Sequence, residues 1–289
     1  MMSDRPAVAG PMVSFVVPTF NSEAVLTAAL ESLAAQTWRD FEVIVSDGAS
    51  SDGTVAMARS FAGRLPALHV DSRPDTGVYD AINRGVALSR GEWFLVLGSD
   101  DQLHAPDTLA QVVRHLRAAG KALMVYGDVR MMAANQTGVP AGGRFAGPMP
   151  LQRWFVANVC QQAIFYRRTL FDTLGGFDLR YRLYADWAFN LRAAFMAPPQ
   201  WVDLVISDYA ATGISASASD ALFVEEMSEL IRSEFAARPG QRELWPAQRH
   251  LLRGADALRR RGDWSRALSF LSTYLCVNAQ RLPGLRPRD

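Results

Sequence analysis

The sequence predicts an α/β fold in which a mostly parallel, mixed sheet is flanked by helices and followed by a helical C-terminal extension. Short apolar runs recur through the first half of the chain, and each ends in polar or turn residues, as buried parallel strands do. Segments with apolar residues at helical spacing separate these runs, which is typical of βαβ units. Beyond about residue 216 the periodicity is helical.

The first half of the chain supplies four of the predicted strands. They lie at 13–17, 41–45, 69–71 and 93–97, and helices begin near residues 22, 54 and 79. Asn21 or Ser22 can cap the first of these helices, because a short polar side chain accepts a hydrogen bond from the first turn. The last of the four strands runs directly into Gly98-Ser99-Asp100-Asp101, where two carboxylates are adjacent.

The second half of the chain mixes shorter strands with helices. We expect a helix at 107–119, a strand at 123–126 that ends at Gly127-Asp128, and a long loop through the Gly- and Pro-rich stretch 133–150. Further strands are expected at 163–166 and 201–206, and helices at 169–174, 185–194, 222–236, 244–261 and 265–278. We therefore divide the chain into a disordered tail at 1–12, an α/β domain at 13–215 and a helical extension at 216–289.

The composition is that of an ordinary globular protein. Hydrophobic residues make up 49% of the chain and the net charge is +1, so nothing in the charge calls for a nucleic-acid partner. Cys160 and Cys276 are far apart and show no metal-ligand spacing, which favours a reducing compartment. Residues 1–11 lack the apolar run of a signal peptide, and no stretch approaches the roughly 20 apolar residues of a spanning helix. We expect a cytoplasmic protein.

The C-terminal segment is basic. Between residues 249 and 289 there are nine arginines against three aspartates and no glutamate, interleaved with leucines and aromatic residues. Such a segment could rest on an anionic membrane surface, which would make the protein peripheral to the inner face of the cell membrane. A solvated helical cap is the alternative, and the sequence does not choose between them.

Acidic residues follow several of the predicted strands. Asp47, Asp128 and the pair Asp100-Asp101 each stand at such a position, and the carboxyl ends of strands converge on one edge of an open α/β sheet. Adjacent carboxylates there are costly unless a positive group neutralises them, and a divalent cation does so with oxygen ligands. Each acid could instead cap the following helix. Because no glycine-rich phosphate loop is present, a phosphate-containing ligand would need a metal to hold its charge.

Four motif-like stretches follow one another along the chain. They are Val16-Val17-Pro18-Thr19-Phe20-Asn21, Val45-Ser46-Asp47-Gly48-Ala49-Ser50-Ser51-Asp52-Gly53-Thr54, Gly77-Val78-Tyr79-Asp80-Ala81-Ile82-Asn83-Arg84-Gly85 and Leu97-Gly98-Ser99-Asp100-Asp101. In this order they resemble family 2 glycosyltransferases, which are inverting enzymes of the GT-A fold. The resemblance covers about residues 13–215, and the Gly77-to-Asn83 stretch is closest to the subgroup that builds O-antigen, capsule or colanic-acid-type repeats. Gly175-Gly176-Phe177-Asp178 and Ala185-Asp186-Trp187 also match in order.

The resemblance implies a donor, an acceptor and a cofactor. The donor would be a nucleotide-diphosphate sugar, most often a UDP-sugar, and the acceptor a hydroxyl of a lipid-linked glycan or an oligosaccharide. Mg²⁺ or Mn²⁺ would stabilise the departing diphosphate. Ser99-Asp100-Asp101 stands at the position of the Asp-x-Asp motif, so Asp101 would be the metal ligand and Asp186 the catalytic base. Nucleotide-sugar binding would fall to Pro18, Thr19, Asn21, Asp47 (facing the base), Asp80, Asn83, Ser99 and Asp100.

The chain also departs from the family pattern. Ser99 replaces the first acid of the Asp-x-Asp motif, and Ile82 stands where many relatives have arginine. Gln161-Gln162 occupies a position where relatives often have His-Gln, which leaves the acceptor side open. For Asp186 the alternative role is helix capping, with Asp178 as the rival base.

Two other functions remain as alternatives on the sequence alone. A sugar-phosphate nucleotidyltransferase has a related fold but usually carries a glycine-rich basic loop after its first strand, where this chain has Pro18-Thr19-Phe20-Asn21. A non-catalytic sugar-nucleotide-binding or scaffold module would have no need to keep Asp47, Asp101 and Asp186 together.

Overall fold

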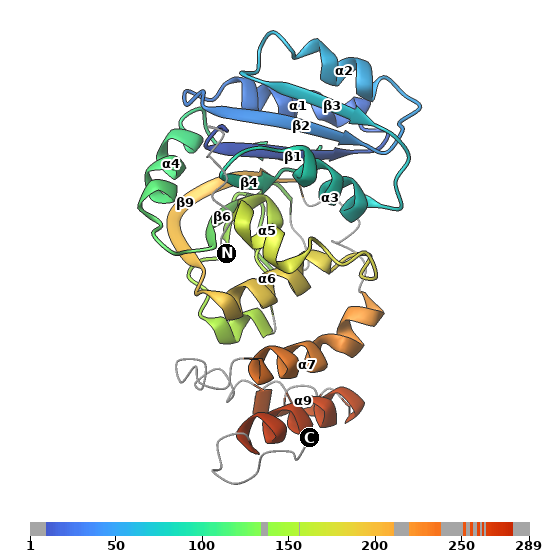
Figure 1. Ribbon diagram of the computed structural model, residues 1–289, viewed down its shortest axis with the longest axis vertical. Helices are drawn as coiled ribbons and strands as arrows, with labels where there is room; N and C mark the ends of the chain where they lie inside the picture. Colours follow the sequence, from blue (N-terminus) through green and yellow to red (C-terminus); the bar gives the residue numbers. More distant parts are fainter. Residues whose placement is uncertain are drawn as a thin grey trace, which may run out of the picture.

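The computed structural model shows one curled, mixed β-sheet with helices on both faces and C-terminal helices stacked beyond it (Figure 1). The residues that the structure describes are 10–133, 138–155, 157–210, 220–237, 251–252, 255–256, 259–260, 262 and 264–279. The expected tail at 1–12 therefore falls mostly outside the described residues, and so does most of the helix expected at 244–261.

The first half of the sheet is parallel, as the sequence predicts. Its strands are β1 (Val13–Thr19), β2 (Phe41–Asp47), β3 (Leu68–Ser72) and β4 (Trp93–Val96), in the spatial order β3-β2-β1-β4. They alternate with α1 (Glu23–Ala34), α2 (Thr54–Ser60) and α3 (Val78–Leu88). β1, β2 and β4 are apolar because helices cover both of their faces, and they are almost wholly buried.

The second half adds antiparallel pairs. β8 (Ile164–Arg167) pairs antiparallel with both β4 and β6 (Met124–Met131), while β9 (Gln200–Tyr209) runs parallel to β6. Two short strands, β5 (Gln102–Leu103) and β7 (Arg144–Phe145), pair with β9 and β6. The helices here are α4 (Thr108–Ala118), α5 (Arg168–Leu174) and α6 (Ala185–Met196), with 3₁₀ turns η1 (Leu151–Phe155) and η2 (Gln161–Ala163).

Two predictions for this half are wrong. The strand expected to end at Gly127-Asp128 continues to Met131, with irregular register around Asp128, so this acid lies inside a strand. The stretch 133–150, expected to be loop throughout, contains β7. The reason is the same in both cases, because β6 is extended by pairing with β7 and β9, which are distant in sequence.

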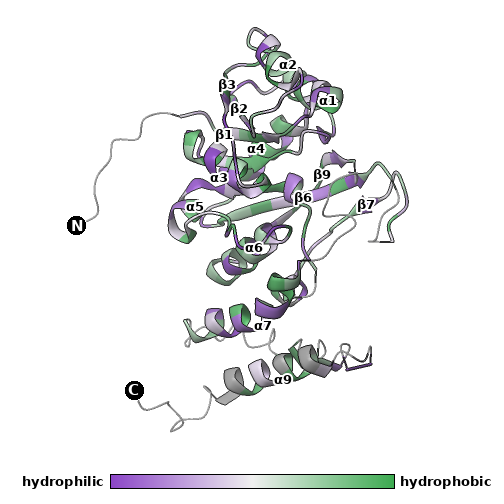
Figure 2. Ribbon diagram, turned by 90° about the vertical axis from the view of Figure 1, so that its right-hand side faces the viewer, coloured by the Kyte–Doolittle hydropathy of each residue, from purple (hydrophilic) through white to green (hydrophobic). Residues whose placement is uncertain are grey.

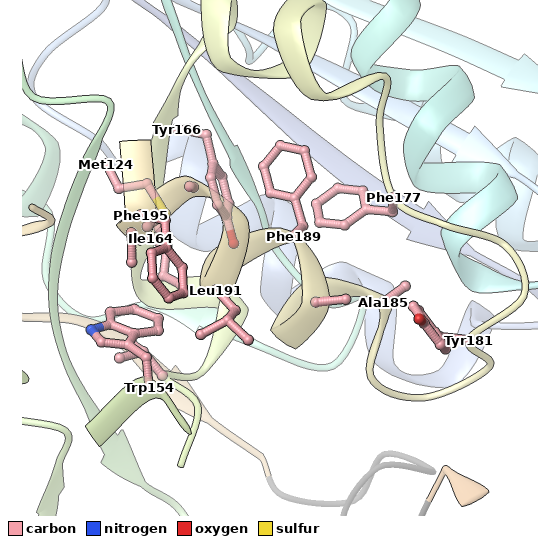
Figure 3. Close-up of a cluster of buried hydrophobic side chains, with 14 of the residues drawn as sticks. Met124, Trp154, Ile164, Tyr166, Phe177, Tyr181, Ala185, Phe189, Leu191 and Phe195 are labelled. Carbon is pink, nitrogen blue, oxygen red and sulfur yellow. The ribbon is translucent and has the colours of Figure 1, made fainter. Parts of the chain in front are cut away.

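Each face of the sheet carries an apolar core. One core lies under α1, α2 and α4, and the other lies between the sheet and α3, α5 and α6. Aromatic rings dominate the second core: Phe94 of β4 stacks on Tyr166 of β8 with ring centroids 5.1 Å apart, and Phe177 contacts Phe189 of α6 at 4.8 Å. Figure 3 shows this packing around α6, which fixes the helix that carries Asp186.

The C-terminal helices continue the second core. α7 (Ala221–Ala236) packs on α6, where the rings of Phe235 and Phe195 are 4.9 Å apart, and α9 (Trp264–Ala279) packs on α7 (Figures 1 and 2). The helices expected at 222–236 and 265–278 are thus present, while the boundary at residue 216 stays a prediction. Within the described part of the chain, no helix combines the length and apolar character needed to cross a membrane.

Candidate active site

Asp47 lies at the carboxyl end of β2, beside Thr19 of β1, and is fully buried. Its carboxylate accepts hydrogen bonds from Thr19 Oγ1 (2.9 Å), Ser72 Oγ (2.6 Å), and the backbone N–H (2.9 Å) and hydroxyl of Ser50. Burial acts to raise the pKa of Asp47, but the four donors outweigh it and hold that pKa below its usual value. Because they fill the lone-pair positions of the carboxylate, a nucleotide contact would have to replace one of them.

The loops after β1, β2 and β4 meet at the same edge of the sheet. Asn21 is left-handed, with φ +47°, and its Oδ1 accepts a hydrogen bond from Ser51 N at 3.0 Å. Ser99 Oγ donates to Ser22 Oγ at 3.1 Å, which joins the loop after β4 to the start of α1. The predicted donor-binding residues Pro18, Thr19, Asn21, Asp47 and Ser99 are therefore gathered at one edge, as expected for strand-end loops.

Asp101 is a buried carboxylate, 3% exposed, in the turn after β4. Its Oδ2 accepts a hydrogen bond from Gln162 Nε2 (2.8 Å) and its Oδ1 from Ala210 N (2.9 Å). Burial raises the pKa of Asp101 to about 7, and the charge of Asp100 adds to the effect, while the Ala210 N–H and Gln162 oppose it. A cation at this position would favour the ionised form of Asp101.

Gly98 leaves open the point on which the two adjacent carboxylates converge. A Cβ atom there would lie 2.5 Å from Asp101 Oδ2 and 3.0 Å from Asp100 Oδ1. Within the described residues, no group of three or more His, Cys, Asp or Glu side chains forms a complete metal site. A magnesium-type ion needs no such cage, since it is usually held by one or two carboxylates and by substrate phosphates. The paired carboxylates beside Gly98 fit that mode of binding.

Asp186 is held in the first turn of α6 by two side chains from elsewhere in the chain. Tyr79 Oη lies 2.8 Å from Asp186 Oδ1, and Asn158 Nδ2 donates to Asp186 Oδ2 at 2.8 Å. Asn190 Nδ2 donates in turn to Asn158 Oδ1 at 2.9 Å. Burial raises the pKa of Asp186 to about 6, although Tyr79, Asn158 and nearby backbone N–H groups favour the ionised form.

The segment 158–162 connects the two acids. Asn158 bonds Asp186, and Gln162, four residues later, bonds Asp101. Between them lies the Cys160 thiol, whose pKa is raised first by burial and then by the charges of both Asp101 and Asp186. The two carboxylates are therefore held by side chains four positions apart in one segment. That they act together in a single site stays a prediction.

The sequence matches the family model for glycosyl transferase family 2 over residues 14–175, more than half of its length. The chain belongs to glycosyl transferase family 2. A "PGL/p-HBAD biosynthesis glycosyltransferase" of Mycobacterium bovis is 44% identical over 209 residues, which is 70% of this chain and 78% of the relative. An "uncharacterized glycosyltransferase" of Mycobacterium tuberculosis is 34% identical over 214 residues, which is 71% of this chain and 78% of that protein.

Solved structures share the fold of this family 2 glycosyltransferase. Staphylococcus aureus TarS 1–349 in complex with UDP-GlcNAc superposes with a TM-score of 0.67 and 21% identity, over 93% of this chain and 83% of that one. The mannosyltransferase PcManGT from Pyrobaculum calidifontis, in complex with GDP-Man and Mn²⁺, gives 0.59 and 20% identity over 93% and 76%. The expected GT-A fold is confirmed, as is the assignment as a glycosyltransferase.

Two predicted donor-pocket residues of the glycosyltransferase also serve its fold. The Asn83 amide pairs with the backbone of Phe177 in both directions, through Nδ2 to Phe177 O (2.8 Å) and from Phe177 N to Oδ1 (2.9 Å). The left-handed Gly176, φ +88°, allows this approach. Asp80 Oδ2 accepts from the Thr76 N–H (2.9 Å) and hydroxyl (3.0 Å) at the start of α3. A donor contact by Asn83 or Asp80 stays a prediction.

Two other acids lie in ion pairs. Asp128 accepts from Arg144 Nε (2.9 Å) and Trp201 Nε1 (3.1 Å), and that it joins the other strand-end acids stays a prediction. Asp178, the rival base, is paired with Arg180, whose hydrogen bonds outweigh partial burial and lower the pKa of Asp178. A lowered pKa makes Asp178 a weaker base than Asp186.

Sequence reasoning missed several residues of the site. Tyr79 and Asn158, which hold Asp186, are 107 and 28 positions away from it. Tyr79 lies in the third family stretch but has no role assigned to it there, and no local pattern marks Asn158. Ser72, which bonds Asp47, ends a strand that is only partly apolar. Gln161 stands out in the sequence only as a departure from the family, and its buried Nε2 has no hydrogen-bond partner within the described residues.

Proposed function

We propose that the protein is a metal-dependent, inverting glycosyltransferase. It transfers a sugar from a nucleotide-diphosphate sugar to a hydroxyl of a lipid-linked glycan. The observation that carries this proposal is the pairing of two acids with different surroundings, Asp101 and Asp186, at the two ends of the segment 158–162. Two acids in different environments can serve different roles, one in binding a cation and the other in removing a proton.

Asp186 serves as the base. The acceptor hydroxyl oxygen forms a bond to the anomeric carbon while the bond from that carbon to the diphosphate breaks, and the bonding electrons leave with the diphosphate. The hydroxyl proton passes to Asp186. A single displacement of this kind inverts the anomeric centre, whereas a glycosidase needs two carboxylates flanking the bond. With its pKa raised to about 6, Asp186 is mostly ionised at neutral pH and still basic enough to accept the proton.

Asp101 would hold the cation, with Asp100 beside it. Mg²⁺ or Mn²⁺ bound there would supply charge stabilisation to the departing diphosphate. Gln162 Nε2 and Ala210 N orient the Asp101 carboxylate, so its remaining lone pairs are available for a ligand. The open point beside Gly98 supports this assignment, and the Mn²⁺ in the PcManGT complex shows that a relative in fold binds such an ion.

The strand-end loops bind the nucleotide. Thr19, Asn21 and Asp47 belong to a hydrogen-bonded edge of the sheet. Asp47 would contact the base by giving up one of its four internal hydrogen bonds. We propose a UDP-sugar as donor, which the UDP-GlcNAc in the TarS complex supports, although PcManGT binds GDP-Man on the same fold.

The acceptor belongs to bacterial surface glycan assembly. The sequence motifs favour an O-antigen, capsule or colanic-acid-type repeat, but the relatives that are 44% identical are named for PGL/p-HBAD biosynthesis. We therefore favour an acceptor of the kind that is used in PGL/p-HBAD biosynthesis. A lipid-linked acceptor would bring the enzyme to the inner face of the cell membrane.

The proposal is tested with a panel of UDP-, GDP- and dTDP-sugars, with and without Mn²⁺. Calorimetry measures donor binding, and NMR of the product reports the anomeric configuration. We expect cation-dependent binding of one donor that is lost in Asp101→Asn and kept in Asp203→Asn, an exposed carboxylate that pairs with Arg144. Binding without turnover of any donor, in the presence of lipid-linked glycan acceptors, would favour a non-catalytic module. Retention of configuration would exclude Asp186 as the base of a single displacement.

A further inference from the structure

Helix α9 is the outermost element of the protein at the end away from α1 and α2 (Figures 1 and 2). One side of it is packed against the rest of the chain. Ala267, Phe270 and Thr273 are buried, and Thr273 Oγ1 donates to the backbone oxygen of Ser228 in α7 at 3.2 Å. This side accounts for the docking of α9 on α7.

The other side of α9 is apolar and exposed. Trp264, Leu268, Leu271 and Leu275 are 59%, 62%, 37% and 58% exposed. Their spacing of four, three and four residues places them along one stripe, about 16 Å long at the helical rise of 1.5 Å per residue. Single exposed apolar residues are common on protein surfaces, but a contiguous apolar stripe marks a binding surface. We call these four residues the α9 stripe.

The sequence segment that contains the α9 stripe carries a net positive charge. The sixteen residues of α9 contain one charged residue, Arg266, and no carboxylate. Arg259 and Arg260, both exposed, precede the helix and share one acid, Asp256, as their partner. Over residues 249–289 the sequence has nine arginines, three aspartates and no glutamate.

This charge discriminates between two possible occupants of the stripe. A second copy docking through the same stripe would form a two-fold interface and bring two sets of arginines together, which costs free energy. An anionic lipid surface is complementary to both features, since it accepts apolar side chains at the acyl boundary and attracts arginine at the headgroups. Tryptophan is also enriched at the level of the headgroups.

We propose that the α9 stripe is a membrane-binding surface that lies in the headgroup region of an anionic phospholipid bilayer. The inference rests on the proposed function in one respect, because a lipid-linked acceptor is the reason that the enzyme would need a membrane. α9 packs on α7 and α7 on α6, whose first turn carries Asp186, so the axes of α6 and α9 are up to about 16–20 Å apart. A membrane-bound acceptor would have to bridge at least the α7 layer to reach Asp186.

The test is co-sedimentation of the full chain with vesicles, in the absence of any sugar donor. Vesicles of phosphatidylcholine alone are compared with vesicles that also contain phosphatidylglycerol. We expect binding to the anionic vesicles only, and at least a tenfold loss of partitioning in the double variant Leu268→Ser/Leu275→Ser. The matched control is Val25→Ser, which replaces an exposed apolar residue on α1, at the opposite end of the molecule. It should bind like the parent.

Two further measurements keep the outcome decisive. Circular dichroism melting and nucleotide binding check that the double variant is folded, and sedimentation velocity gives the mass of each protein. Vesicle binding that survives the double variant would overturn the proposal. The proposal would also be overturned if the parent is a dimer, the double variant is a monomer, and neither protein binds vesicles.

If the protein binds vesicles through the stripe but turns over no sugar nucleotide, the proposed function fails and the membrane surface stands. If it turns over sugar nucleotide but binds no vesicles, the membrane surface fails and the proposed function stands.

Discussion

The hydroxyl of Tyr79 offers a direct way to change the basicity of Asp186. Tyr79 Oη lies 2.8 Å from Asp186 Oδ1 and 2.7 Å from the backbone oxygen of Leu183. Its single hydrogen can serve only one of these acceptors at a time. When Asp186 is ionised it attracts this hydrogen, and when Asp186 is protonated it can donate to Tyr79 while Tyr79 donates to Leu183. Tyr79→Phe removes the hydroxyl and leaves the ring in place against Phe177.

The expected magnitude follows from the hydrogen bond that is lost. A hydrogen bond to a charged group contributes about 1.5–3 kcal/mol, which corresponds to about one to two pKa units. Because the hydrogen is shared with Leu183, we expect the lower end, so the pKa of Asp186 rises from about 6 to about 7. At pH 6 the ionised fraction then falls from about one half to about one tenth, and kcat/KM falls about fivefold, while at pH 8 the two proteins agree within about 10%.

The assay is a profile of kcat/KM against pH from 5 to 9 for sugar transfer at saturating Mn²⁺. The control is Tyr181→Phe, which removes a tyrosine–carboxylate hydrogen bond to Glu226 outside the site and should leave the profile unchanged. A loss of equal size at every pH would show that Tyr79 acts by positioning alone. If the acidic limb of the pH profile has the same midpoint in Tyr79→Phe as in the parent, the assignment of that limb to Asp186 is refuted.

Two further predictions concern the acids themselves. Gly98→Ala places a methyl group against Asp100 and Asp101, so we expect at least a tenfold loss of Mn²⁺-dependent UDP binding by calorimetry, whereas Gly63→Ala, which meets no atom within 4 Å, should bind normally. Asp186→Asn should raise the melting temperature at pH 8 but not at pH 4. The pKa of Asp186 is raised from 3.8 to about 6 on folding, so the stability it contributes is present below pH 3.8 and lost as the pH rises through about 6. The expected gain is about 1–3 kcal/mol, and a lower melting temperature at pH 8 would contradict the raised pKa.

The sequence was sufficient for the elements whose pattern is local. β1, β2 and β4 are apolar runs buried on both faces, and each is followed by turn residues, so their positions could be read directly. β5 and β7 have two residues each and exist only because β9 and β6 lie alongside. The end of β6 was misplaced for the same reason, since pairing with distant strands extends β6 beyond its apolar run.

The site shows the same division. Asp47, Asp101 and Asp186 stand at a strand end, a turn after a strand and a helix start, and family motifs mark all three. Their chemistry is set by tertiary packing. Burial among residues that are distant in sequence raises the pKa of Asp186, and its hydrogen-bond partners Tyr79 and Asn158 come from other parts of the chain. A local sequence pattern does not show how deeply a side chain is buried in the folded protein, so these contacts could not be predicted from it.

The central claim is that Asp186, rather than Asp178, removes the acceptor proton. It is tested most directly by kcat for sugar transfer in Asp186→Asn and Asp178→Asn, with donor binding measured on the same samples. We predict that Asp186→Asn binds donor like the parent and loses about 10²–10⁴-fold in kcat, as expected for loss of a general base, while Asp178→Asn keeps its rate. Parent-like turnover by Asp186→Asn, or a loss confined to Asp178→Asn, would contradict the claim.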